Sequence, residues 1–275
     1  MKGKSEKLDS FKSILDHERH ISNVLRGIRN VNQMIVQEDD PHQIIEKACI
    51  NLTETFSYYN AWIVLFDKDM RVIDSASSGI EGNFDKLISR ISGGDSIPCI
   101  RLAMDRDGVV VISDPEKECP ECPLSGKYSN SAGFCRRLSF KDRIYGLLTV
   151  SVPGAYAKDE EEKGLFNEIA GDLAFAMHKT ELNQNLRKME RIINRSSSVA
   201  YIVEASDELR FEFVSDSIRQ FGYSPEDFGC GKLSLEKVIH PEDKERFFRE
   251  IEEYSSQKGC NYFVQNYRKI GRAHV

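Results

Sequence analysis

The feature that most constrains the fold is a change in the spacing of apolar residues along the chain. In the first part of the chain they recur at helical spacing, as at Ile21, Leu25 and Ile28. From residue 61 this spacing gives way to two short β-rich segments, "AWIVLFD" (61–67) and "RVIDSASS" (71–78), joined by three residues as in a hairpin. Helices and strands must therefore pack together within one region of the chain.

Two helices are predicted before this change. The first covers residues 8–37, with apolar residues on one side and arginines on the other. The second follows "EDDP", where Asp40 has the side chain of an N-cap and Pro41 suits the first helical turn.

After the first hairpin the pattern predicts helices, a strand, a loop, a second hairpin and a long helix. The order indicates an antiparallel sheet with helices on one side, which is an α+β fold. The segments are helices at 82–91 and 97–104, a strand at 108–114, a loop at 115–132, a hairpin of 133–140 with 143–153, and a helix from about 159 to about 193.

Three of these segments, "NAWIVLFD", "GVVVISD" and "YGLLTVSVP", with their flanking helices, resemble the GAF family of small-molecule sensor domains. The resemblance covers residues 18–188 and leaves 1–17 as an N-terminal signalling helix. "PCIRLAM…CPECPL…YGLLTVSVP" is similar to a cysteine-containing subgroup from bacterial and archaeal signalling proteins. The resemblance implies a pocket between one face of the sheet and the segments 96–104 and 115–132. The motif of the cyclic-nucleotide-binding relatives and a bilin-attachment context are both absent from the sequence.

The segment after the long helix resembles a PAS domain. "AYIVE" and "FEFVS" match its first two strands, and "SDSIRQFGYSPEDF" and "IHPED" match its helical and turn motifs. The resemblance implies a PAS domain at 196–269 without its last two strands. Residues 270–275, "IGRAHV", match a reading frame of a common sequencing adapter, so we expect them to be an artefact and the natural protein to continue.

The connecting helix, 160–195, carries a possible coiled-coil seam. Leu182, Leu186, Met189 and Ile193 follow 4-3-4 spacing. A homodimer through the helices is expected, and the alternative is a terminal helix that packs only on its own sheet.

Four cysteines are predicted to gather at the pocket: Cys99, Cys119, Cys122 and Cys135. Cys119 and Cys122 form a C-x-x-C pair, and four thiolates can hold zinc in a tetrahedral site or an iron–sulfur cluster. Zinc, an iron–sulfur cluster and haem are the candidate cofactors, and Lys117, Lys127, Arg136 and Arg137 are candidates to offset the negative charge.

Two other interpretations of these cysteines stay open. The pair could act as a redox-sensitive switch, or all four could be ordinary loop and core thiols, because free cysteine is often buried. Cys49, Cys230 and Cys260 are expected to be structural. No catalytic residue is predicted, since His178 lacks a phosphoacceptor motif and His240 suits a helix cap.

Composition excludes several classes of function. The net charge of −6 among 275 residues gives no electrostatic reason to expect nucleic-acid binding, and no apolar segment is long enough for a membrane span or signal peptide. A cytoplasmic location is expected, with reduced cysteines.

These observations predict the sensory input fragment of a signal-transduction protein. The fragment is not itself an enzyme; it senses a small molecule or a redox or metal state, and a histidine kinase is the expected output domain. The alternatives are the input region of a diguanylate cyclase, and an enzyme similar to the GAF-type methionine sulfoxide reductases.

Overall fold

The computed structural model of the chain divides into two compact units, with the division after Asn183. The residues that the structure describes are 27, 29–31, 33, 37–56, 58–80, 82–94, 97–127, 130–196, 198–203, 211–229, 233–234, 237 and 239–256.

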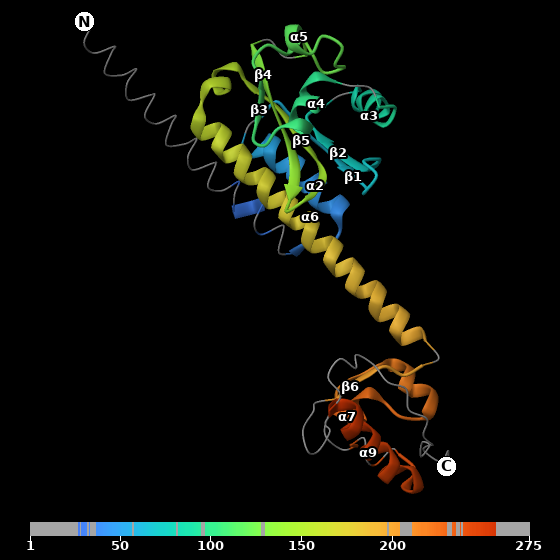
Figure 1. Cartoon of the computed structure of the whole chain (residues 1–275). Coiled ribbons are helices and arrows are strands. Elements are labelled where there is room, and N and C mark those ends of the chain that lie inside the picture. The colour runs from blue at the N-terminus through green and yellow to red at the C-terminus, as the bar shows by residue number, and fades with distance from the viewer. Residues whose placement is uncertain are drawn as a thin grey trace, which may run out of the picture. The chain divides into compact units, whose positions relative to one another are not determined.

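The first unit is built on a five-stranded antiparallel sheet in the order β2-β1-β5-β4-β3 (Figure 1). Sequential hairpins join β1 to β2 and β4 to β5, while β5 returns to pair with β1 in the centre of the sheet. The strands are β1 (Asn60–Phe66), β2 (Val72–Ser78), β3 (Val110–Ile112), β4 (Ser131–Phe140) and β5 (Arg143–Pro153).

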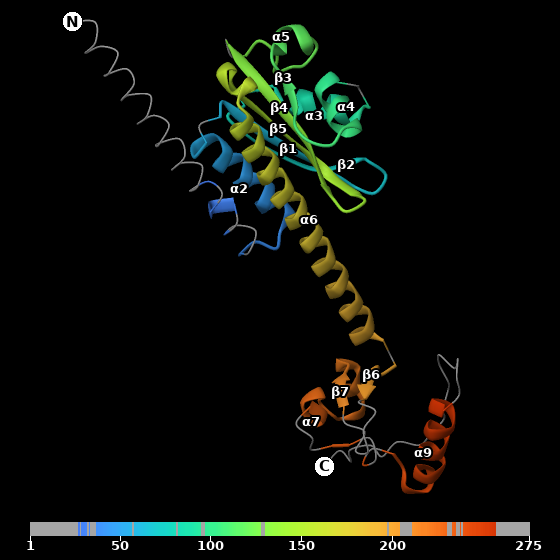
Figure 2. The ribbon, with the colours of Figure 1, turned by 60° about the vertical axis from the view of Figure 1, so that its left-hand side comes forward.

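Helices cover both faces of this sheet. In Figure 2, α2 and α6 lie on one side of the sheet and α3 and α4 on the other. The helices are α2 (Pro41–Glu54), α3 (Phe84–Ser92), α4 (Pro98–Asp105), α5 (Pro115–Glu118) and α6 (Glu160–Arg195), with a 3-10 turn η1 (Gly154–Lys158) before α6.

Local chemistry explains where these helices begin. Asp40 caps α2, its carboxylate accepting a hydrogen bond from the backbone N–H of His42 at 3.1 Å, and Pro41 occupies the first turn as predicted. Asp114 caps α5 in the same way through the N–H of Lys117. The two predicted hairpins are confirmed by the strand pairing.

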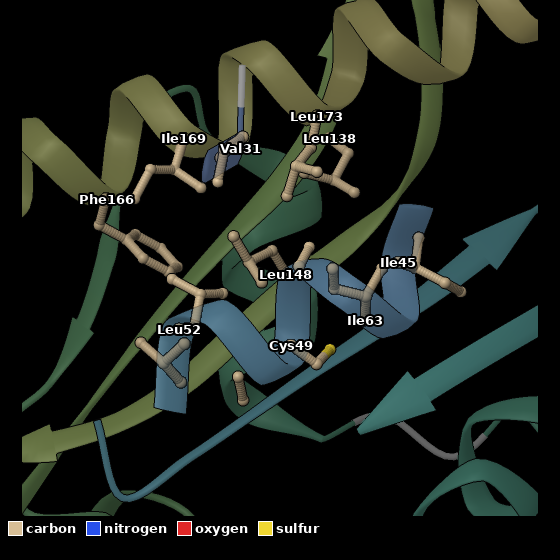
Figure 3. Close-up of a cluster of buried hydrophobic side chains, with 14 of the residues drawn as sticks. Val31, Ile45, Cys49, Leu52, Ile63, Leu138, Leu148, Phe166, Ile169 and Leu173 are labelled. Atoms are coloured by element: carbon tan, nitrogen blue, oxygen red, sulfur yellow. The ribbon is translucent and has the colours of Figure 1, made fainter. Parts of the chain in front are cut away.

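The larger hydrophobic core lies between the sheet and the pair α2 and α6. Phe166, Ile169 and Leu173 point from α6 toward Leu52 of α2 and Leu148 of β5 (Figure 3). All five side chains are at most 1% exposed. The apolar stripe of the first half of α6 is therefore buried against its own sheet.

The predicted α+β class is confirmed, but the expectation that the helices lie on one side of the sheet is wrong. All seven residues of β1 are buried, and they alternate between the two faces. Such a strand needs cover on both sides, and α3 and α4 supply the second layer. The predicted loop at 115–132 also contains α5 and the first residues of β4.

Polar contacts join the sheet to α6 at two levels. The hydroxyl of Tyr58, just before β1, donates a 2.5 Å hydrogen bond to Glu162 in the first turn of α6, where both side chains are buried. Further along the helix, the hydroxyl of Tyr145 on β5 lies 2.8 Å from Nδ1 of His178 and 3.1 Å from Glu181, which also pairs with Arg143.

The second unit contains a two-stranded antiparallel sheet and short helices around its own core. Its core residues include Val214, Ile218, Phe228, Ile239 and Phe247. The described elements are β6 (Tyr201–Val203), β7 (Phe211–Val214), a 3-10 turn η2 (Asp216–Phe221), α7 (Pro225–Gly229) and α9 (Pro241–Ser256). The expected helix cap is present in part: the N–H of Glu242 points to Nδ1 of His240 at 3.4 Å.

Several predictions fall on residues outside the described part of the chain. They concern the signalling helix at 1–17, most of the predicted helix at 8–37, Cys230, Cys260 and the segment 270–275.

Candidate functional site

A second hydrophobic core lies on the face of the sheet opposite α2 and α6. Trp62, Val64 and Phe66 of β1 face it, because the intervening residues of β1 face the larger core. Its cover comes from α3, α4 and the segment that follows α5. The other buried members are Leu87, Ile97, Cys99, Ala103, Val110, Ile112, Cys119, Leu124, Cys135 and Leu147.

The four predicted cysteines all belong to this core or pack against it. Cys99 is in the first turn of α4, Cys119 ends α5, Cys122 lies three residues later, and Cys135 is in β4. All four are free thiols; Cys122 is partly exposed, whereas the other three are buried. The fold thus brings together three segments that are far apart in the sequence.

Cys99 occupies the centre of this cysteine cluster. Its thiol is hydrogen-bonded to the thiols of both Cys119 and Cys135, and Cys122 lies within electrostatic range. Cys135 pairs with Thr149 across β4 and β5, and the Thr149 hydroxyl donates a 3.0 Å hydrogen bond to the Cys135 sulfur. The sulfurs of Cys119, Cys99 and Cys135 therefore form a continuous hydrogen-bonded chain.

The surroundings favour the thiol form of Cys99, Cys119 and Cys122. For Cys99, the hydrogen bond with Cys119 lowers the pKa, but the hydrogen bond with Cys135 and burial outweigh it, so the pKa is raised. The hydrogen bond with Cys99, followed by burial, raises the pKa of Cys119. Burial raises the pKa of Cys122 as well. At neutral pH a metal ion would have to displace protons from these sulfurs.

The C-x-x-C segment is a series of tight turns. The N–H of Cys119 bonds to the carbonyl of Pro115, that of Cys122 to Cys119 and that of Ser125 to Cys122, each at 3.0 Å. The side chain of Asn83 donates to the carbonyl of Pro123 at 3.3 Å, which ties this segment to the start of α3.

Sequence analysis missed two residues that act on the cluster. Thr149 bonds to the Cys135 sulfur, and the positive charge of Arg90 lowers the pKa of Cys122, although burial outweighs it. Arg90 on α3 also donates to the carbonyl of Glu121 between the two cysteines. Strand pairing partners and helix positions of this kind can be read only when the register and the path of the chain are known.

Lys117, Arg136 and Arg137, three of the basic residues expected to offset the cluster's charge, are engaged elsewhere. Lys117 pairs with Asp114 at 2.6 Å, and Arg137 bonds to the carbonyl of Met104 at 2.7 Å. Arg136 points to the other face of the sheet, where it donates to the carbonyl of Asn167 on α6. The alternation along β4 places consecutive residues on opposite faces, so this outcome for Arg136 follows from the strand itself.

Asn60 is a further polar group in this region that sequence analysis missed. Its side chain is fully buried at the start of β1, and neither of its amide atoms has a hydrogen-bond partner in the structure. Alternation places it on the same face as Trp62, beside the row of Trp62, Thr149 and Cys135. Buried amides without partners are rare, because each lost hydrogen bond is costly.

Sulfur donors suit zinc and other soft metals. Among the described residues, however, no group of three or more His, Cys, Asp or Glu side chains is arranged to hold a metal ion. Metal binding by Cys99, Cys119, Cys122 and Cys135 stays a prediction.

The second unit is similar to a known domain family. A family model described as "PAS fold" matches residues 211–272. The second unit carries a PAS domain. The boundaries of this domain, 196–269, stay a prediction.

A curated relative is a sensor. The chain is 27% identical over 120 residues to the "Methyl sulfide methyltransferase-associated sensor" of Methanosarcina acetivorans. The match covers 42% of this chain and 12% of that protein, so the chain spans only a small part of the length of this relative.

Solved structures similar to this chain include GAF domains. The GAF domain of an Acinetobacter phosphoenolpyruvate–protein phosphotransferase is 13% identical, with a TM-score of 0.44, over 57% of this chain and 94% of that one. The free methionine-R-sulfoxide reductase of Neisseria meningitidis is 16% identical, with a TM-score of 0.39, over 58% and 93%. Likenesses at this level carry no information about what this chain binds.

The prediction of a GAF domain followed by a PAS domain is confirmed. The antiparallel sheet with flanking helices of the first unit has the architecture that the resemblance implied, and the PAS match lies where the second domain was expected. None of the described helices has the length and apolar character needed to cross a membrane.

Proposed function

We propose that this chain is the sensory input part of a signal-transduction protein, and that its GAF domain senses a small molecule or a redox or metal state at the cysteine cluster. The observation that supports this most directly is that four free thiols lie together on one face of the sheet, and that the thiol of Cys99 is hydrogen-bonded to two of the others. Thiols are the side chains that respond to soft metals and to oxidants.

A physical route leads from this cluster to α6 through strand β5. Thr149 on β5 bonds to the Cys135 sulfur, and Tyr145 on the same strand bonds to His178 and Glu181 of α6. A change of ligand or oxidation state at Cys135 would alter its hydrogen bond with Thr149, and a resulting shift of β5 would alter the contacts of Tyr145 with α6. The helix would then favour one of two packings on the sheet.

The second half of α6 is suited to carry this change in a dimer. Leu182, Leu186 and Met189 of the predicted seam are 52%, 51% and 61% exposed, and Phe175, one heptad before Leu182, is 48% exposed. Exposed apolar residues at heptad spacing favour a helical partner, and a second copy of the same helix supplies an identical seam. We therefore propose a homodimer through α6.

A histidine kinase in a two-component system is the proposed output, and the input region of a diguanylate cyclase is the alternative in the same class. We propose a cytoplasmic location, no nucleic-acid partner and no catalytic activity for this fragment. The competing class is an enzyme similar to the GAF-type methionine sulfoxide reductases. Turnover of free methionine sulfoxide with a thiol reductant would favour the enzyme over the sensor.

Hydrogen exchange along α6 tests the sensory proposal. Addition of Zn²⁺, or oxidation by a disulfide reagent, should change the exchange of β5 and of α6 between Tyr145 and Met189 in the wild-type chain. The same treatment should have no such effect in Cys135→Ser. Cys49→Ser is the matched control, because Cys49 is an equally buried thiol in the other core. Unchanged exchange in α6, with zinc bound or the thiols oxidised, would refute the proposal.

A further inference from the structure

The C-x-x-C motif suggests that Cys119 and Cys122 are the redox pair, but the contacts of their sulfurs differ from this expectation. The thiol of Cys119 is hydrogen-bonded to Cys99, and the backbone N–H of Cys99 also points at the Cys119 sulfur. The sulfur of Cys122 instead accepts hydrogen bonds from the backbone of Leu124 and Ser125 in its own turn. The hydrogen-bonded sulfur partner of Cys119 is therefore on α4, 20 residues earlier in the chain.

We propose that Cys99 and Cys119 form a reversible disulfide and that Cys122 is the thiol through which oxidation enters. This inference rests on the proposed function, because it names how the same cysteine cluster would be regulated. The bond would fasten the first turn of α4 to the end of α5.

The geometry favours Cys119 over Cys135 as the partner of Cys99. Hydrogen-bonded thiols have their sulfurs in contact, so a bond of about 2.05 Å needs only a small movement of both groups. Cys119 lies in a turn that can make this adjustment. Cys135 is fixed in β4, between its pairing partners Val110 and Thr149, and its sulfur is engaged by the Thr149 hydroxyl.

Exposure favours Cys122 as the entry point. It is partly exposed, whereas Cys99 is 7% exposed and Cys119 is 4% exposed. The hydrogen bond from the N–H of Cys122 to the carbonyl of Cys119 closes a turn, which holds the two Cα atoms within about 7 Å of each other. A disulfide between these two residues is therefore within reach as an intermediate.

The chemistry proceeds by three thiol–disulfide exchanges. The Cys122 sulfur attacks a small-molecule disulfide, forming a mixed disulfide and releasing one equivalent of the small thiol. The Cys119 sulfur then attacks the Cys122 sulfur and releases the second equivalent. Finally the Cys99 sulfur attacks the Cys119 sulfur, forming the Cys99–Cys119 bond and returning Cys122 to the thiol. Overall, two protein thiols lose two electrons and two protons, and the oxidant is reduced to two thiols.

Oxidised glutathione is the probe for the test, with peptide mapping of the unreduced full chain over time. In the wild-type chain the glutathione adduct of Cys122 should appear first, and the Cys99–Cys119 disulfide should be the final product. Cys122→Ser should form the same product at about one tenth of the wild-type rate or slower, because only buried thiols are then available to the oxidant. Cys99→Ser should stop at Cys119–Cys122, and Cys49→Ser should behave as the wild type.

A final product of Cys119–Cys122 or Cys99–Cys135 in the wild-type chain would overturn the proposal, as would a first adduct on Cys99 or Cys119. The wild-type time course decides this even where a variant fails to fold. The outcome is also separable from that of the sensory proposal. Formation of Cys99–Cys119 without a change of exchange in α6 would refute the sensory role alone.

Discussion

The buried contact between Tyr58 and Glu162 allows a quantitative test of how the core is tied to α6. The two residues are 104 positions apart, 3% and 1% exposed, and joined by a 2.5 Å hydrogen bond. A hydrogen bond to a carboxyl group of this kind contributes about 1.5–3 kcal/mol, and a buried partner left without it costs a similar amount. We therefore expect Tyr58→Phe and Glu162→Leu each to lower the free energy of unfolding by about 2–3 kcal/mol.

The double variant separates this contact from the other effects of each substitution. Replacing both partners with apolar groups of similar size removes their hydrogen bond without leaving either of the two groups buried and unpaired. The double variant should therefore be more stable than the sum of the two single changes predicts, by about 1.5–3 kcal/mol.

Trp62 provides the assay. It is the single tryptophan of the chain and lies 2% exposed in β1, so its fluorescence during urea unfolding reports on the first unit alone. This matters because a chain of two units need not unfold in one step. A coupling free energy below about 0.5 kcal/mol would refute the argument, since that is the range of residues that do not interact.

Three further predictions address the core, the thiols and the helix seam. Gly146→Ala should lower the free energy of unfolding by about 3 kcal/mol or more, because a Cβ there would overlap the carbonyl oxygen of Val64. Gly164→Ala should raise it by about 0.5–1 kcal/mol, because the added methyl group would lie in open space on α6. Equal effects of the two substitutions in urea unfolding would contradict this. Burial raises the pKa of Cys49, so this thiol ionises at a lower pH in the unfolded state than in the folded state. Its contribution to the free energy of unfolding is therefore complete below about pH 8.5 and should fall as the pH rises above that value. Cys49→Ala should reduce that slope by about 1.4 kcal/mol per pH unit, and an unchanged slope would show that this thiol titrates normally. The full chain should sediment as a dimer at micromolar concentrations and the double variant Leu186→Glu, Met189→Glu as a monomer, with Lys188→Ala as control; a monomeric wild type would exclude the seam.

Part of this molecule could be predicted from local pattern, because local chemistry determines it. Asp40 and Pro41 specify the start of α2, and the unbroken run of apolar, mostly β-branched and aromatic residues in "AWIVLF" specifies β1, since both depend on neighbours within a few residues. The sequence also identified Cys99, Cys119, Cys122 and Cys135 as the residues worth attention, through a family resemblance and the spacing of one pair.

The tertiary structure alone decided which of these groups meet. The thiol of Cys119 is hydrogen-bonded to Cys99 rather than to Cys122, its neighbour in the motif, because α4 and α5 both pack against β4. The helices lie on both faces of the sheet because the fully buried β1 must be covered twice, and Arg136 contacts α6 because alternation along β4 points it away from the cluster. Contacts of this kind, like that between Tyr58 and Glu162, depend on the path of the chain between distant residues. The spacing of residues in the sequence does not determine that path, because the pairing of the strands in the sheet decides it.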